Sequence, residues 1–222
     1  MLLALTLLTA PAQAWEVLQT ENGDPVRFVE MPVAWTYDDS QVPSDIENDA
    51  HSSAVADSMD VWGQVEQGGV TFEKDGADAN TVYWEPNWEW DDALLAITST
   101  WATDDGEIVG FDTRINGEYA NWGVDDENKM DLQNTMTHEI GHALGLDHNP
   151  ELYEATMYPT ASVGDLSKRE LEADDGDAIR YLYGKALEEE KPLFACNASG
   201  ASSSMIGVLS AAATLFLRRR KA

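Results

Sequence analysis

Runs of β-branched and aromatic residues, separated by turn-forming residues, follow one another along the first half of the chain and predict a series of short strands. One helix interrupts the series, because apolar residues recur at helical spacing from a cap at Ser44 or Asp45 to about Glu66. The pattern therefore predicts strands with an early helix packed against them. The predicted strands cover residues 26–29, 33–37, 70–73, 81–84, 94–98 and 106–112.

The second half of the chain changes to helical patterns. One helix is expected around residues 138–142, and a last helix from Lys168 to about Leu182, with Gly184 as its C-terminal cap. A chain of 222 residues can bury one core of this kind and carry short additional segments. We therefore expect a single domain at residues 26–185.

The segments on either side of this domain differ from it in composition. Residues 1–14 hold an apolar run and then small residues, which is typical of a secretory signal peptide; a buried strand or helix is the alternative. Residues 15–25 form a polar lead-in, and residues 186–204 are predicted to be a linker. Residues 205–222 are apolar with a basic end, which favours a membrane anchor or a surface-sorting segment. We therefore expect a secreted, extracellular protein that this last segment can anchor at the cell surface.

The chain is strongly acidic, with 13 Lys and Arg residues against 41 Asp and Glu residues and a formal net charge of −28. Four of the basic residues lie together at positions 218–221. Such a surface repels phosphate groups and anionic lipids, so we expect no nucleic-acid partner. The single cysteine, Cys196, excludes an intrachain disulfide framework within this sequence.

Several of the acidic residues are close in sequence and offer oxygen ligands of the kind that Ca²⁺ prefers. No segment has the D-x-D-x-D-G pattern of a calcium-binding loop. Two hypotheses therefore stand, a Ca²⁺ site and solvated acidic turns. The residues concerned are Asp104, Asp105, Glu107 and Asp112, followed by Asp125, Asp126 and Glu127.

The most specific pattern in the chain is H-E-x-x-H-x-x-G-x-x-H. On a helix, His138 and His142 lie on one face, where two imidazoles can bind one Zn²⁺. Gly145 can adopt the positive φ that ends a helix, so that His148 can return to the metal as a third ligand. Three protein ligands leave one position open for water, and Glu139 is placed to act on that water as a general base. The alternative is a surface helix that merely carries histidines.

This window resembles the extended zinc signature of the metzincin metallopeptidases. Residues 155–159 (ATMYP) resemble their Met-turn, which implies that Met157 lies beneath the three-histidine site. With residues 182–184 (LYG), these motifs most resemble the matrixins, the matrix-metallopeptidase-like branch. The resemblance covers residues 26–185 and is strongest from Thr135 onward.

The resemblance implies an α+β fold with a twisted mixed sheet of about five strands and three helices, in which the active-site helix is followed by the Met-turn. It also implies a secreted zinc-dependent endopeptidase that acts on protein or peptide substrates, with an edge strand near residues 94–102 that pairs with the substrate backbone. Two alternatives remain. One is a non-catalytic adhesion or binding module stabilised by zinc, and the other is a zinc hydrolase that acts on a non-peptide bond.

Two features of many matrixins are not matched in this sequence. A second, structural zinc would need histidines before the active-site helix, and only His51 precedes His138. We interpret His51 as a packing or surface residue of the first helix. The cysteine that occupies the zinc in the family's propeptide also has no counterpart, because Cys196 follows the domain. If the enzyme is held latent, we expect another device to do so.

Overall fold

The computed structural model describes residues 15–44, 46, 49–74, 80–118, 120–184 and 211–217. The predicted signal peptide at 1–14 and the linker at 186–204 lie outside the described residues, as do 205–210 and 218–222 of the predicted C-terminal segment. No helix in the described part of the chain is long and apolar enough to cross a bilayer.

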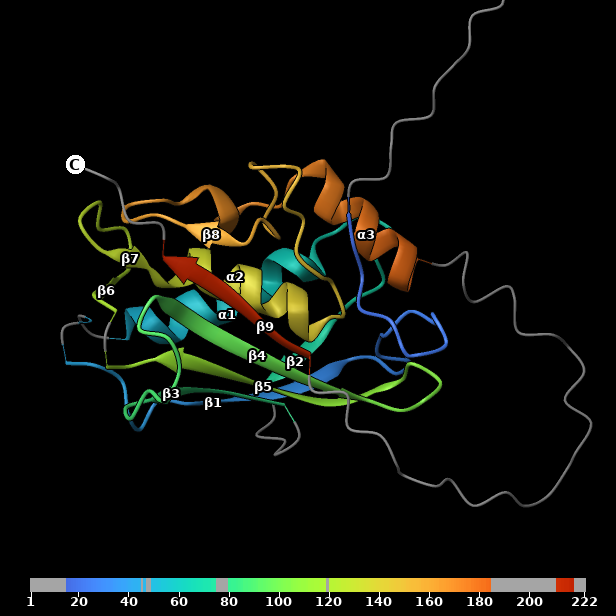
Figure 1. Ribbon diagram of the computed structural model, residues 1–222, viewed down its shortest axis with the longest axis horizontal. Helices are drawn as coiled ribbons and strands as arrows, with labels where there is room; N and C mark the ends of the chain where they lie inside the picture. Colours follow the sequence, from blue (N-terminus) through green and yellow to red (C-terminus); the bar gives the residue numbers. More distant parts are fainter. Residues whose placement is uncertain are drawn as a thin grey trace, which may run out of the picture.

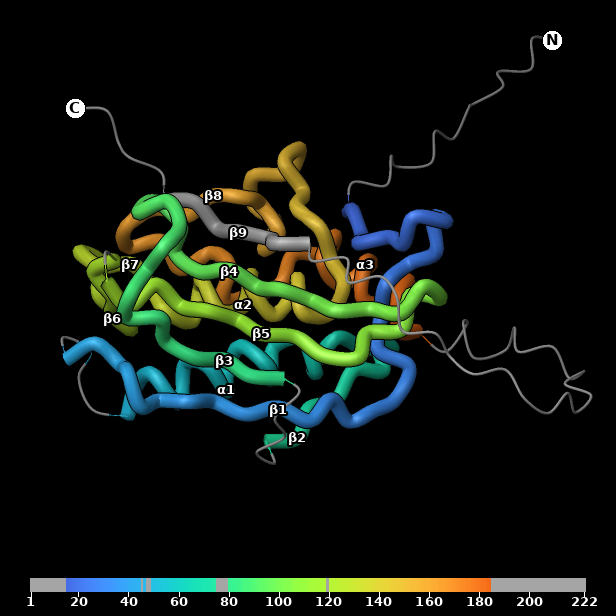
Figure 2. The backbone as a smooth tube through the Cα atoms, turned by 60° about the horizontal axis from the view of Figure 1, so that its bottom comes forward, coloured from blue at the N-terminus to red at the C-terminus, as the bar shows by residue number. Residues whose placement is uncertain are grey.

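A mixed sheet forms one layer of the domain, and Figure 2 shows its strands side by side. The first five strands lie in the order β2-β1-β3-β5-β4, all parallel except β4, which runs antiparallel to β5. Their bounds are β1 (Val33–Asp38), β2 (Phe72–Lys74), β3 (Asn80–Glu85), β4 (Leu94–Ala102) and β5 (Ile108–Asn116). The expected mixed sheet of the α+β class is therefore confirmed.

Two further strands extend the sheet beyond β4. The short β8 (Thr160–Ala161) runs parallel to β9 (Ala211–Leu217), and β9 pairs antiparallel with β4 (Figure 1). A separate two-stranded sheet consists of β6 (Trp122–Gly123) and β7 (Met130–Asp131), which leads directly into the central helix. The edge of the five-stranded core is thus covered by chain from the C-terminal part of the molecule.

Helices α1 (Ala50–Gly63) and α2 (Leu132–Ala143) pack against each other and lie on one face of the sheet (Figure 1). The third helix, α3 (Ala173–Tyr183), follows a single 3₁₀ turn, η1 (Ser167–Arg169). The number of α-helices among the described residues agrees with the prediction. The start predicted for the last helix at Lys168 is wrong, because Glu172 and Asp175 form a capping box that begins α3 at Ala173.

The two central helices are joined by a hydrogen bond from a buried tryptophan. Trp62, fully buried at the end of α1, donates from its indole Nε1 to the Thr137 carbonyl of α2 at 2.8 Å. Almost every residue of α2 is buried, including its polar ones. The helix therefore lies in the core between the sheet and the C-terminal part of the domain, and its orientation is fixed from several sides.

The polar lead-in packs onto the domain. Val17 forms a β-bridge with Leu146, and the Leu18 amide donates to the Gly145 carbonyl at 2.8 Å. The rings of Trp15 and Tyr181 lie 4.6 Å apart, centroid to centroid. Residues 26–29, predicted to be a strand, form only a bridge at Arg27. The lead-in thus packs against residues 145–146, which follow the central helix.

The loop between β3 and β4 carries two tryptophans, one of them buried. Trp88 is buried, its amide donates to the Glu118 carboxylate at 2.8 Å, and its indole donates to the Asp91 carbonyl at 3.0 Å. Trp90 packs on Trp88 with ring centroids 4.9 Å apart. Aromatic packing and hydrogen bonds therefore hold this loop.

Candidate metal centre

The start of α2 is fixed by a buried aspartate. The Asp131 carboxylate accepts the Asn134 amide at 2.8 Å and caps the helix. The guanidinium of Arg169, from η1, donates to both Asp131 oxygens at 2.8 and 2.5 Å. This bidentate pair joins the segment after the Met-turn to the first turn of α2.

One glycine, Gly145, ends helix α2. Gly145 has φ +94° and donates to the His142 carbonyl, while the Leu146 amide donates to the Gly141 carbonyl, both at 3.0 Å. This is a Schellman motif, which ends a helix with a left-handed residue. A Cβ at position 145 would also lie 2.1 Å from the Val26 carbonyl oxygen. Only glycine fits here, and the chain turns so that His148 faces back toward the helix.

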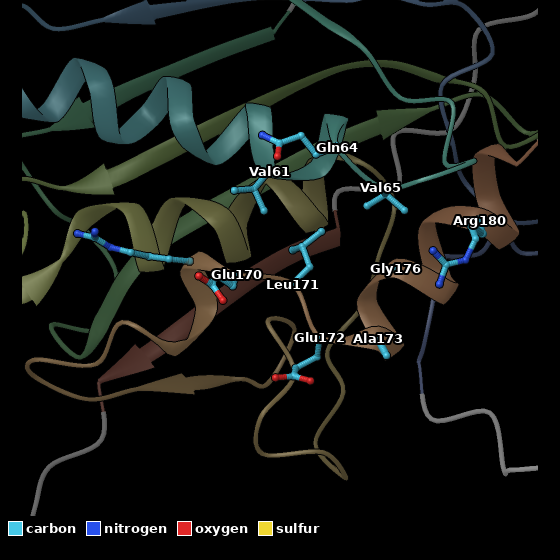
Figure 3. A pocket seen from close by; sticks show the side chains of 10 residues that line it. Val61, Gln64, Val65, Glu170, Leu171, Glu172, Ala173, Gly176 and Arg180 are labelled. Atoms are coloured by element: carbon cyan, nitrogen blue, oxygen red, sulfur yellow. The ribbon is translucent and has the colours of Figure 1, made fainter.

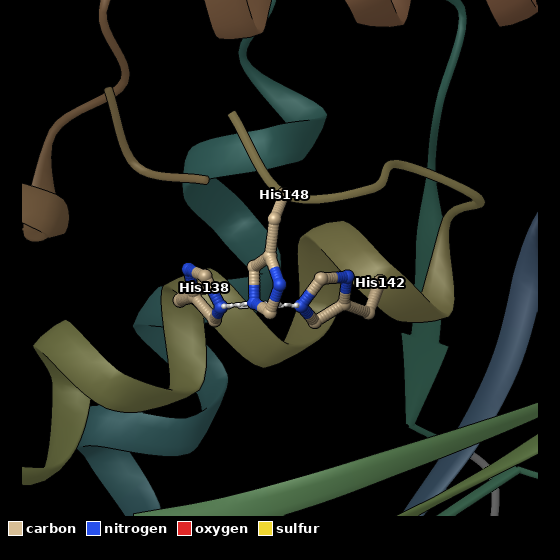
Figure 4. Close-up of side chains that lie close together, drawn as sticks. All are labelled: His138, His142 and His148. Atoms are coloured by element: carbon tan, nitrogen blue, oxygen red, sulfur yellow. Dashed lines mark hydrogen bonds between the residues drawn. The ribbon is translucent and has the colours of Figure 1, made fainter. Parts of the chain in front are cut away.

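The three imidazoles of the motif converge on one point (Figure 4). The Nε2 atoms lie 3.1 Å apart between His142 and His138, 3.2 Å between His138 and His148, and 3.3 Å between His142 and His148. Three nitrogens bound tetrahedrally at 2.0–2.1 Å would lie about 3.3 Å from one another. The spacing of the three Nε2 atoms therefore fits a single zinc ion.

The other ring nitrogens set the tautomer of the two helical histidines. His138 Nδ1 lies 2.6 Å from the Thr156 carbonyl and His142 Nδ1 lies 2.9 Å from the Leu146 carbonyl, so each Nδ1–H donates and each Nε2 keeps its lone pair. Burial lowers the pKa of His142 to about 3 and that of His138 well below its usual value, and the Lys168 charge adds to the effect at His138. Both imidazoles are therefore neutral near pH 7, as a metal ligand requires.

Met157 packs against α2 at Gly141, the residue just before His142. A Cβ at Gly141 would lie 2.3 Å from the Met157 sulfur and 2.9 Å from the Trp62 ring. The lack of a side chain at Gly141 thus makes room for Met157, which is buried. The structure places this methionine against α2 at Gly141, and its position beneath the three histidines stays a prediction from the resemblance.

Asp175 of α3 holds the Met-turn from below. Its buried carboxylate accepts the Thr156 amide at 2.9 Å and the Met157 amide at 3.3 Å, and also caps α3 by accepting the Glu172 amide at 3.0 Å. Burial raises the pKa of this carboxyl, and the three amide donors act in the opposite direction. One side chain therefore ties the third helix to the backbone beneath the histidines.

Replacing Asp175 with alanine is expected to destabilise the protein by about 3 kcal/mol, because buried amide donors would lose their acceptor. Activity should fall with it as the Met-turn loosens. Urea denaturation measures the free energy of unfolding, and Asp177→Ala is the matched control. Asp177 forms only an exposed ion pair with Arg180, so its loss should change the stability by less than about 1 kcal/mol. Equal stabilities of the two variants would contradict the role given to Asp175.

Lys168 is a second buried residue at the Met-turn. Its ammonium donates to the Thr156 carbonyl at 2.9 Å and to the Tyr158 carbonyl, and burial lowers its pKa to about 7. Its own amide donates to the Asn134 side chain of α2 at 2.7 Å. Lys168 thus fixes the carbonyls on either side of Met157, and one of them, that of Thr156, also accepts from His138.

Glu139 is fully buried and faces the sheet. Its Oε2 accepts from the Thr98 hydroxyl of β4 at 2.6 Å, and the Thr98 and Thr113 hydroxyls lie 2.9 Å apart. The next inward residue of β4, Thr100, donates to the His142 carbonyl at 3.2 Å. Strand β4 therefore holds both the glutamate and the end of the helix.

The sequence predicted the three histidines, the glutamate, Gly145 and Met157 as site residues, and the structure brings the three histidines together. It did not identify Thr98, Lys168 or Asp175. The Glu172–Asp175 spacing was an available signal for the start of α3, since it matches an acidic capping box. The contact of Asp175 with the Met-turn depends on the tertiary fold and has no such signal.

Within the described residues, the three histidines form the one group of at least three His, Cys, Asp or Glu side chains close enough to share an ion. His51 lies apart from them, buried, with Nδ1 3.0 Å from the Tyr37 hydroxyl. A separate hollow of about 500 Å³ lies between the end of α1 and the start of α3, and none of the three histidines lines it (Figure 3). The metal centre is thus distinct from that hollow.

A helix that ends at a glycine supplies two imidazoles, and the turn beyond it supplies the third. On this mixed sheet, with the Met157 sulfur packed against the same helix, the arrangement is typical of the metzincin class of zinc metallopeptidases. Within that class, the family model of the matrixins matches residues 30–184. The chain belongs to the matrixin family.

Relatives from animals and from a plant support this membership. The chain is 27% identical to matrix metalloproteinase-26 of Homo sapiens over 166 residues, which are 71% of this chain and 60% of that protein. It is 47% identical to metalloendoproteinase 2-MMP of Arabidopsis thaliana over 55 residues, 25% of this chain and 14% of the relative. It is 44% identical to matrilysin of Homo sapiens over 55 residues, 25% of this chain and 20% of the relative. The chain thus spans at most 60% of the length of these relatives.

Proposed function

We propose that the chain is a zinc-dependent endopeptidase that hydrolyses peptide bonds in protein substrates. The observation that carries this proposal is the spacing of 3.1–3.3 Å among the Nε2 atoms of three histidines, of which at least His138 and His142 are held as the neutral tautomer. The buried Glu139 follows the first of them on the same helix.

In the proposed mechanism, His138, His142 and His148 hold the metal. Zinc bound there supplies a Lewis acid that polarises a carbonyl and lowers the pKa of water. Glu139 takes a proton from the attacking water as the oxygen bonds to the scissile carbonyl carbon. The same carboxyl then gives that proton to the amine nitrogen as the C–N bond breaks.

Thr98 orients the general base. Its hydroxyl donates to Glu139 Oε2 at 2.6 Å, and this bond helps to fix the orientation of the buried carboxylate. The substrate is proposed to bind in extended form along the outer edge of β4, by backbone pairing of the kind that adds a strand to a sheet. The part of β4 that contacts α2 would then lie alongside the scissile bond.

The alternative is a non-catalytic adhesion or binding module in which zinc serves only for stability. Both proposals require bound zinc, so only a measurement of turnover distinguishes them. The purified chain should cleave casein or a peptide library, lose that activity with 1,10-phenanthroline, and regain it when zinc is restored. A zinc-loaded protein that cleaves none of these peptides would favour the binding module. Cleavage of esters but not peptides would favour a hydrolase of another class.

The predicted signal peptide and C-terminal anchor lead us to propose an extracellular or cell-surface location. Treatment of intact source cells with a protease, followed by detection of the domain, tests this location. A domain that stays protected inside intact cells would contradict it.

A calcium site among the acidic turns remains a separate proposal. If Ca²⁺ binds there, the melting temperature should rise by several degrees at millimolar Ca²⁺, since a ligand that binds only the folded state stabilises it. The measurement is a thermal-shift titration of the zinc-loaded protein, with Mg²⁺ as the control cation. An unchanged melting temperature would leave these carboxylates as solvated turns.

A further inference from the structure

The outer edge of β4 already carries a partner from the same chain. Strand β9 pairs with it in antiparallel fashion over residues 94–100, and pairs with β8 on its other side in parallel (Figure 1). A backbone segment is therefore inserted between β4 and the residues that follow the Met-turn. An edge strand has one row of free amide and carbonyl groups, so only one extended segment can use it at a time.

The register brings β9 beside the catalytic end of the domain. Ala213 lies opposite Thr98, the residue whose hydroxyl donates to Glu139 at 2.6 Å. Ala211 lies opposite Thr100, which donates to the carbonyl of His142. Strand β9 also contacts α2 itself. Strand β9 thus lies alongside the part of β4 that contacts the proposed general base and a histidine of the metal site.

We propose that residues 211–217 occupy the peptide-binding edge in cis and hold the enzyme latent. This proposal rests on the endopeptidase function proposed above, and it adds an intramolecular competitor for the substrate. A tethered segment has an effective concentration on the order of millimolar. A substrate at micromolar concentration therefore competes poorly until β9 leaves the edge.

The same segment was predicted to be part of an anchor or sorting signal. The pairing and the anchoring use the same residues, so they exclude each other. Transfer of the segment to a membrane or a processing enzyme, or its proteolytic removal, would then free the edge of β4. In this way the arrival of the protein at its destination is coupled to activation.

A pair of cysteines tests the pairing without relying on activity. Ser99 lies opposite Ala212, and opposed residues of antiparallel strands have Cα atoms about 4.5–5.5 Å apart, within disulfide range. We expect Ser99→Cys with Ala212→Cys, in a Cys196→Ser full-length chain, to form a disulfide detected by mass spectrometry. The matched control is Ser99→Cys with Phe216→Cys, which are four residues out of register and should cross-link far less.

The oxidised registered pair should be inactive, and reduction with a phosphine should restore cleavage of a fluorogenic peptide. Equal cross-linking of the registered and control pairs would overturn the inference, whatever the activity. Efficient registered cross-linking, in a protein that shows no chelator-sensitive cleavage either after reduction or after removal of residues 211–217, would support the pairing and refute the peptidase function. The two proposals therefore fail in distinguishable ways.

A proline substitution tests the latency in the full-length chain. Ala213→Pro removes a backbone donor and disfavours the strand, whereas Ala213→Ser keeps the donor. We expect kcat/KM for a short peptide to rise on the order of tenfold in the proline variant, mainly through a lower KM, and to stay unchanged in the serine variant. Unchanged kcat/KM in both variants, in a protein that is active, would overturn the inference.

Discussion

Replacing Glu139 with alanine is expected to lower kcat/KM by about 10²- to 10⁴-fold while the protein still binds one zinc ion, because the variant loses the general base and no metal ligand. Cleavage of a fluorogenic peptide measures the turnover, and elemental analysis of the dialysed protein measures the zinc. The fold should survive, since the Thr98 hydroxyl keeps its contact with the Thr113 hydroxyl at 2.9 Å.

The informative controls for this variant lie on the paired strands β4 and β5. Thr98→Val retains Glu139 but removes the hydroxyl that orients it, so we expect a smaller loss of kcat, about tenfold, with normal zinc content. Thr113→Val, on β5, removes only the hydroxyl that contacts Thr98. It leaves the Thr98–Glu139 hydrogen bond in place and should have the smallest effect. A Glu139→Ala protein with near-normal turnover would exclude this residue as the base.

Replacing His142 with alanine is expected to remove both the zinc and the activity. Two remaining imidazoles cannot form the three-ligand site, and metal binding also stabilises the folded protein. At a zinc concentration of a thousand times Kd that stabilisation is about 4 kcal/mol, and the variant should lose it. The difference in melting temperature with and without zinc measures this loss.

His51→Ala is the matched control, because His51 is also buried but belongs to a different hydrogen-bond network with Tyr37. It should lower the melting temperature through lost packing and yet keep the zinc-dependent difference. If His142→Ala retained one zinc ion per chain, or if His51→Ala lost it, the assignment of the ligands would be wrong.

The residues of the metal centre that the sequence could predict are local to one helix and its end. The four-residue spacing of His138 and His142 and the glycine three residues later depend only on helix geometry, so the pattern was sufficient. The five strands of the core sheet were also predictable, since each depends on its own run of β-branched and aromatic residues, but the strand predicted at residues 26–29 forms only a bridge at Arg27. The errors were the starts of two helices. Helix α1 begins at Ala50 and not after a cap at Ser44 or Asp45, and a 3₁₀ turn and a new cap replace the start predicted for the last helix at Lys168.

The supporting residues could not be predicted because their roles depend on distant segments. Thr98 meets Glu139 across 41 positions of the chain, and Asp175 meets Thr156 across 19. Nothing in a lone threonine, lysine or aspartate indicates such a partner. The C-terminal strand could not be predicted either. The backbone groups of an apolar run can form their hydrogen bonds within a helix in lipid or by pairing with a sheet edge.

The close approach of the Met157 sulfur to Gly141 makes these two positions a compensating pair. An alanine at 141 would push the methionine away from the histidines, and a smaller residue at 157 would leave an empty volume under the helix. We therefore expect that Gly141→Ala becomes less damaging when position 157 is shortened in the same molecule, with the contact to the Trp62 ring at 2.9 Å as the remaining clash. Design of a more rigid helix α2 in this protein would have to change both residues together.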